Sequence, residues 1–149
     1  MDGDHTPKPY LRTPFGENGG AISPDGRWMV YASDESGRSE IYVQSFPTPG
    51  TKYRVTSDGT TGPWVRWGAD GKELMMFSAD GKNVLTVDVQ VGAEFHSGTP
   101  RTLFTLPKGF VAAGPTPDFQ RLLVSLPIDE NASPSLTVVL DWTAALRRN

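Results

Sequence analysis

The sequence contains no cysteine, no long apolar run and no excess of basic residues. Without cysteine, the chain forms no disulfide bond, no thiolate metal site and no thiol nucleophile. No run approaches the ~18 apolar residues of a membrane span. The first residues, Met1 to Tyr10, are polar and lack the apolar stretch of a signal peptide. We therefore expect a soluble chain without membrane contact, in a compartment that the sequence leaves open.

Acidic and basic residues nearly balance, giving a formal net charge of −3 and a pI near 5.3. A chain with this balance lacks the basic field that draws nucleic-acid phosphates to a protein. The single pair of adjacent basic residues, Arg147 and Arg148, lies near the C-terminus. We therefore expect no nucleic-acid partner.

Turn residues are plentiful, with 16 glycines and 13 prolines, and they favour short strands joined by tight turns. One pattern recurs, in which a turn containing Asp25, Asp70 or Asp118 leads into an apolar run. Asp70 lies 45 residues after Asp25, and Asp118 lies 48 residues after Asp70. A repeat of this length with several short strands is typical of a β-propeller blade. In the third repeat Phe119 replaces the turn glycine, so we expect that corner to be built differently.

We predict an all-β fold, a β-propeller segment of three four-stranded blades. The blade cores fall at about 19–56, 62–105 and 110–143. Residues 1–7 are expected to form a disordered tail. The third repeat has no outer strand of its own, whereas residues 8–14 read as a short strand without a blade. We infer that residues 8–14 supply the outer strand that closes the last blade.

Two apolar runs, 28–32 and 74–77, do not alternate with polar residues, which indicates strands buried on both faces. Propeller rings contain about four to eight blades. Three blades alone would expose two broad apolar end faces, more than a soluble monomer tolerates. Two explanations stay open: the chain is a fragment of a larger propeller, or two copies form a six-bladed ring as an obligate homodimer.

Four segments resemble TolB-type (WD40-like) β-propellers: Ser-Pro-Asp-Gly-Arg-Trp-Met-Val-Tyr at 23–31, Ile-Tyr-Val at 41–43, Trp-Gly-Ala-Asp-Gly-Lys-Glu-Leu at 67–74 and Val-Val-Leu-Asp-Trp-Thr at 138–143. More narrowly, the chain resembles the C-terminal propeller of certain bacterial serine/threonine protein kinases, over roughly residues 8–146. The resemblance implies a six-bladed ring whose loops and central channel bind partners, without catalysis in this segment. A kinase glycine-rich nucleotide loop and a His-Arg-Asp loop are both missing, so signalling is an inherited association.

Four aspartates invite comparison with a metal-binding carboxylate cluster, but each belongs to a turn: Asp25, Asp70, Asp80 and Asp118. A turn aspartate accepts hydrogen bonds from backbone N–H groups one or two residues ahead. Because the repeat places these residues in different blades, we expect neither a metal site nor a cofactor. Asp80-Gly81 is further expected to form a two-residue hairpin turn.

Catalysis is not expected. His5 lies in the predicted tail and His96 in a predicted loop, so a Ser-His-Asp relay would need a third group that holds one of them rigidly. A Gly-x-Ser-x-Gly elbow is also missing. Three tryptophans are expected to pack between blades, because large aromatic rings fill the wedge between sheets: Trp28, Trp67 and Trp142.

A ligand, if one binds, is expected at the axial mouth of the channel, near the innermost strands. The candidate residues are Glu17, Asn18, Trp64 and Arg66. The competing interpretation is that these are solvated loop residues. The mouth would be formed by loops at 15–18, 58–61 and 108–110.

The sequence therefore predicts a non-catalytic interaction or sensor scaffold, related to bacterial signalling proteins, that self-associates and binds a protein or peptide ligand. One alternative is an accessory propeller of a prolyl-oligopeptidase-like hydrolase, where it would gate substrate access. Another is a small-molecule hydrolase that uses the channel. The identity of the ligand and the compartment of a parent protein cannot be inferred from these residues.

Overall fold

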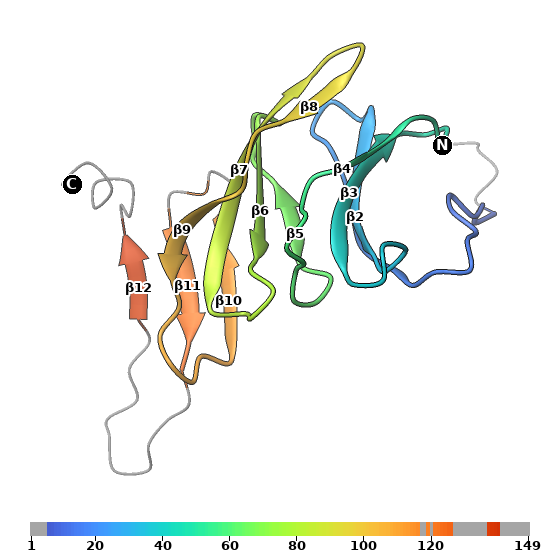
Figure 1. Ribbon diagram of the computed structural model, residues 1–149. Helices are drawn as coiled ribbons and strands as arrows, with labels where there is room; N and C mark the ends of the chain where they lie inside the picture. The colour runs from blue at the N-terminus through green and yellow to red at the C-terminus, as the bar shows by residue number, and fades with distance from the viewer. Residues whose placement is uncertain (1–5, 117–118, 120, 127–136, 141–149) are drawn as a thin grey trace.

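The computed structural model describes residues 6–116, 119, 121–126 and 137–140. In these residues all regular structure is β, arranged as three antiparallel sheets that follow one another along the chain (Figure 1). The expected all-β class is confirmed. The described part of the chain contains no helix with the length and apolarity needed to cross a bilayer.

The first sheet is a four-stranded meander. Its strands are β1 (Glu17–Ile22), β2 (Trp28–Ser33), β3 (Glu40–Ser45) and β4 (Lys52–Arg54), in the order β1-β2-β3-β4. Strand β2 is buried along almost its whole length, as the unbroken apolar run at 28–32 predicts, and strand β3 is buried to a similar extent. Strand β1 begins at Glu17, so the last two residues of the loop expected at 15–18 belong to the strand. Its pairing with β2 is irregular between Asn18 and Ala21.

The second sheet has five strands, where four were expected. They are β5 (Val65–Trp67), β6 (Glu73–Phe77), β7 (Asn83–Val91), β8 (Phe95–Ser97) and β9 (Arg101–Thr105). Strand β7 is long enough to pair with β9 through its first half and with β8 through its last residues. The prediction that His96 lies in a loop is therefore wrong, since His96 pairs with Gln90 in the β7–β8 hairpin.

The third sheet contains β10 (Ala112–Pro115), β11 (Arg121–Ser125) and β12 (Thr137–Leu140), in that order. Strand β11 alternates: Leu122 and Val124 are buried against the second sheet, whereas Leu123 is 48% exposed on the opposite face. Three strands in the described residues match the three that the sequence predicts before residue 143. The tail residues 1–5, Asp118 and Trp142 lie outside the described residues.

The sheet corners share one turn. A backbone N–H bonds the carbonyl three residues earlier at Gly26, Gly71 and Gly81, and each of these glycines has a positive φ. Among non-glycine residues described, only Phe119 has positive φ, so the turn at Asp80 is not of the two-residue kind expected. Like the other corners, it contains one residue with positive φ, here Gly81, whose N–H bonds the carbonyl three residues earlier.

Phe119 corrects a second expectation. Its φ is 54° and its N–H bonds the carbonyl of Thr116 at 2.9 Å, so this corner repeats the glycine geometry. The left-handed conformation is costly for a residue with a side chain. The ring is only 3% exposed and packs in the core between the second and third sheets. Burial of the aromatic ring offsets the backbone cost, which is why the glycine can be replaced.

Two apolar clusters hold the sheets together. The first lies between the first and second sheets and includes Trp28, Trp67 and Phe95. The second lies between the second and third sheets and includes Met75 and Leu122. The predicted packing role of Trp28 and Trp67 is confirmed.

Residues 8–14, predicted as an outer strand, form no strand in the single chain. They lie against the first sheet instead. The Tyr10 ring contacts the Phe46 ring at 5.5 Å, and its hydroxyl donates a hydrogen bond to the carbonyl oxygen of Ser45. Whether residues 8–14 close a blade of another copy stays a prediction, because one chain is described.

Candidate functional site

Strands β1 and β5 are the first strands of their sheets, and they lie against each other. The approach is closest at Gly19, where φ is +68° and a Cβ atom would lie 1.8 Å from the carbonyl oxygen of Pro63. Only glycine permits this contact. Asn18, which precedes Gly19, and Trp64, which follows Pro63, flank this close approach.

The exposed Arg66 and the half-buried Trp64 form a pair on the β5 side of this junction. The Arg66 guanidinium carbon lies 5.6 Å from the centre of the Trp64 ring, and Nη1 donates to the carbonyl oxygen of Val65 at 2.8 Å. The Trp64 ring also packs against the Phe77 ring, with centroids 4.8 Å apart. Arg66 itself is exposed. The result is a guanidinium of fixed orientation that remains open to solvent.

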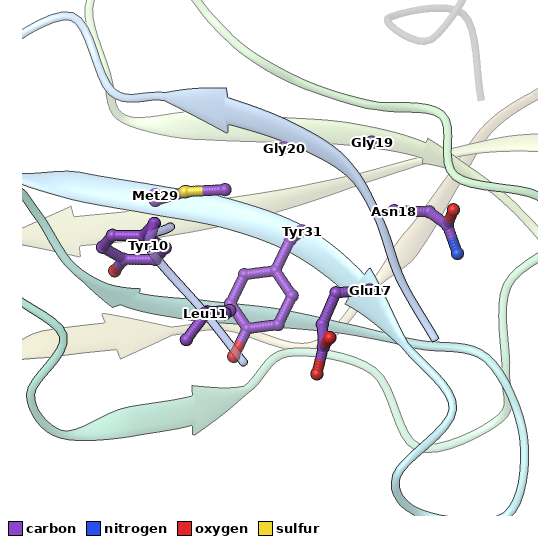
Figure 2. A pocket seen from close by; sticks show the side chains of 8 residues that line it. All are labelled: Tyr10, Leu11, Glu17, Asn18, Gly19, Gly20, Met29 and Tyr31. Carbon is purple, nitrogen blue, oxygen red and sulfur yellow. The ribbon is translucent and has the colours of Figure 1, made fainter. Parts of the chain in front are cut away.

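Glu17 and Asn18 line a pocket of about 150 Å³, which lies between residues 8–14 and strands β1 and β2 (Figure 2). Tyr10, Leu11 and Tyr31 form much of its wall. Known pockets for drug-sized ligands measure about 300–1,000 Å³. This pocket is therefore too small for a whole ligand of that size.

Glu17 brings a carboxylate to the pocket, and Tyr31 brings a buried hydroxyl group. Thr13 Oγ1 donates a hydrogen bond to Glu17 Oε1. Tyr31 is almost fully buried, and its hydroxyl donates to Gln44 Oε1 at 3.2 Å. Burial, with the carboxylates of Glu35 and Glu17 nearby, raises the pKa of Tyr31 well above its usual value. Burial also raises the pKa of Tyr10.

The four predicted site residues thus fall into two groups. Glu17 and Asn18 line the pocket, while the half-buried Trp64 and the exposed Arg66 form a contact pair at the start of β5. The sequence did not indicate Tyr10 or Tyr31 as lining residues. Tyr31 belongs to an apolar run, which by itself indicates a core residue. Tyr10 lies 35 positions from Ser45, whose carbonyl it contacts, so no short-range pattern reveals its place.

The turn aspartates have the structural role predicted for them. Asp25, Asp70 and Asp80 each accept a hydrogen bond from the backbone N–H two residues ahead, at 3.1, 2.9 and 3.0 Å. Hydroxyl groups of Ser23 and Ser78 also donate to Asp25 and Asp80 and lower the pKa of each carboxyl group. No group of three potential metal ligands occurs in the described ranges.

His96 does not resemble a catalytic base. Its side chain is 68% exposed, and Nε2 lies 3.8 Å from Oε2 of Glu94, which is 74% exposed. A relay histidine is oriented by a buried acceptor. His5, the other histidine, lies outside the described residues.

Comparison with known proteins shows the fold. No family model matches the chain, and no curated protein sequence matches it. An oligogalacturonate lyase structure from Vibrio parahaemolyticus is similar at TM-score 0.58 and 14% identity, covering 77% of this chain and 31% of that one. An oligogalacturonate lyase in complex with manganese is similar at TM-score 0.55 and 16% identity, covering 70% of this chain and 27% of that one.

TolB from Acinetobacter baumannii also matches, at TM-score 0.47 and 16% identity, over 92% of this chain and 44% of that one. The chain therefore spans about a third or less of the lyase structures and under half of TolB. The two lyase structures are β-propellers, so the sheets described above have a propeller fold. At these identities the similarity extends to the fold alone.

Proposed function

We propose that this chain is a sector of a β-propeller that acts as a binding scaffold without catalysis, of the TolB type and related to the propellers of bacterial serine/threonine kinases. The Trp64–Arg66 pair carries the proposal, because it lies beside the contact between the first strands of two sheets. In a propeller these strands line the channel, where ligands bind.

The geometry of the pair favours an acidic ligand. The guanidinium is planar by its own delocalisation, and one held over an indole ring loses little further freedom when it forms a two-point contact with a carboxylate. Arg66 is exposed. We therefore propose that the ligand is a protein or peptide segment bearing an aspartate or glutamate side chain.

The test compares Arg66→Ala with Arg54→Ala, which removes another exposed arginine on β4. Binding of an acidic peptide library is measured by fluorescence anisotropy. We expect selected peptides to bind the wild type and the Arg54→Ala variant equally, and to bind Arg66→Ala at least about tenfold more weakly. Equal binding by all three proteins, or an absence of acidic peptides among those selected, would contradict the proposal.

A catalytic function is the second candidate, because the same guanidinium offers a two-point contact to the carboxylate of an acidic sugar. Two similar structures are oligogalacturonate lyases. Incubation with oligogalacturonate, with and without manganese, separates the two proposals. Turnover that Arg66→Ala abolishes would favour the enzyme, whereas binding without turnover would favour the scaffold.

A further inference from the structure

The first and third sheets end differently. The first sheet has four strands, whereas the described residues of the third sheet give three, with β12 at its outer edge (Figure 1). An edge strand presents backbone N–H and C=O groups that can pair with a strand from elsewhere. In the described structure, the pairings of β12 are with β11.

Residues 8–14 form no strand in the described structure, although their sequence suits the edge of a sheet. Pro9 and Pro14 flank Tyr10 to Thr13, and prolines in sheets occur at edges and strand ends. The segment lies on the first sheet through the Tyr10 side chain, and the pocket of about 150 Å³ remains beneath it. Its packing is therefore incomplete.

The segment covers a face that is built for burial. Tyr31 and Tyr42 of the first sheet are 3% and 4% exposed, and Tyr10 and Leu11 share the pocket with Tyr31. At the other end of the molecule, Leu123 is exposed beside Arg121 on β11. Glu17 on β1 of the first sheet and Arg121 on β11 of the third sheet have opposite charges. Both ends thus carry apolar side chains beside a charged residue.

We propose that residues 8–14 exchange between two positions. In the single chain they cover their own first sheet, and in a homodimer they form a fourth strand beside β12 of a second copy. Because few residues separate Thr13 from β1, the donated strand brings the first sheet of one copy against the third sheet of the other. Twofold symmetry repeats the exchange and closes a ring of six sheets. The exchange does not depend on which ligand Arg66 binds.

Two substitutions shift the exchange in opposite directions. Tyr10→Phe removes the hydroxyl that bonds the Ser45 carbonyl in the single chain, while it keeps the ring. Arg12→Pro removes a backbone donor that the donated strand needs, and residue 12 belongs to no strand in the single chain. Arg12→Ala is the matched control, because it loses the same side chain but keeps the N–H.

Sedimentation equilibrium measures the dimer dissociation constant of each protein. We expect a concentration-dependent dimer for the wild type, a dissociation constant roughly threefold to tenfold lower for Tyr10→Phe, and one at least about tenfold higher for Arg12→Pro than for Arg12→Ala. Circular dichroism and tryptophan fluorescence confirm that each monomer is folded. A wild type and Tyr10→Phe that stay monomeric at high concentration would overturn the proposal, and so would equal constants for the two Arg12 variants.

The absence of cysteine permits a direct test of the pairing. Leu11→Cys and Val138→Cys are prepared as separate proteins, mixed and oxidised. We expect a disulfide between the two different variants, since the donated strand lies beside β12. Equal linkage in a mixture of Leu11→Cys with Glu94→Cys, which places the thiol on the exposed turn after β7, would contradict it.

Discussion

Phe95 of β8 packs against Trp28 of β2, with ring centroids 5.8 Å apart and planes inclined at 50°. Phe95 also contacts Tyr53 and Trp67, at 5.5 and 6.5 Å. The short β7–β8 hairpin therefore extends from the second sheet and clamps the first. Phe95 is 1% exposed, so its contacts exclude water from the junction between the two sheets.

Replacing Phe95 with alanine should loosen this junction. Removal of a buried phenylalanine ring costs about 3–5 kcal/mol of unfolding free energy. We expect Phe95→Ala to lower the free energy of unfolding by this amount in urea denaturation, and Phe95→Leu to lower it by less than half as much. A loss below about 1 kcal/mol for the alanine variant would show that the hairpin does not brace the first sheet.

The β7–β8 hairpin also marks the limit of what the sequence predicts. Turn motifs identify the sheet corners, because Asp25 and Asp80 bind backbone N–H groups within two residues. The position of β8 depends instead on Phe95 reaching Trp28 of another sheet, a contact between residues 67 positions apart. Short-range patterns carry no information on such a contact, so the sequence predicts a loop at His96 where the structure has β8.

Phe119 shows a second limit of the same kind. A positive φ at a residue other than glycine is unfavourable locally, so a glycine-free corner was expected to differ. The ring finds its place against atoms of the second sheet, including a contact near Gly68. Tertiary packing thus decides the backbone conformation at this position.

For the candidate site, sequence position indicated the strands but not the partners. Trp64 and Arg66 lie together, because Trp64 directly precedes the short strand β5 and Arg66 is its second residue. Glu17 and Asn18 were grouped with them, yet they line a separate pocket with Tyr10 and Tyr31. Separating the two groups required knowing that residues 8–14 fold onto the first sheet.

Gly19→Ala tests the contact between β1 and β5. A Cβ atom would overlap the Pro63 carbonyl, which belongs to the backbone and cannot move aside alone. Gly37→Ala is the control, because Gly37 also has a positive φ but nothing lies within 4 Å of its added Cβ. We expect thermal unfolding to show about 1 kcal/mol of destabilisation for Gly37→Ala and at least 1–2 kcal/mol more for Gly19→Ala. Equal losses would mean that the sheets tolerate separation here.

Glu40→Gln tests a buried carboxylate that ties the first sheet to the segment leading into the second. Glu40 is fully buried and accepts hydrogen bonds from Thr56 Oγ1, the Gly59 N–H and Arg38 Nε. Glutamine has the same shape, but its NH2 group would face the groups that donate to Glu40. It also loses the ion pair with Arg38. We expect urea unfolding to show a loss of about 2–3 kcal/mol. The exposed Glu94→Gln should change the free energy by less than about 0.5 kcal/mol.

Alkaline pH should weaken the fold through Tyr31. Burial raises the pKa of this hydroxyl in the folded state above the value near 10 in the unfolded chain. Its contribution is therefore complete below pH 10, and it is lost as pH rises from 10 towards the folded pKa, by up to about 1.4 kcal/mol per pH unit. We expect the free energy of unfolding, measured in urea between pH 8 and 11, to fall less steeply in Tyr31→Phe than in the wild type. Tyr53→Phe controls for the change of residue type, and identical slopes in wild type and Tyr31→Phe would show that the Tyr31 hydroxyl stays accessible to water.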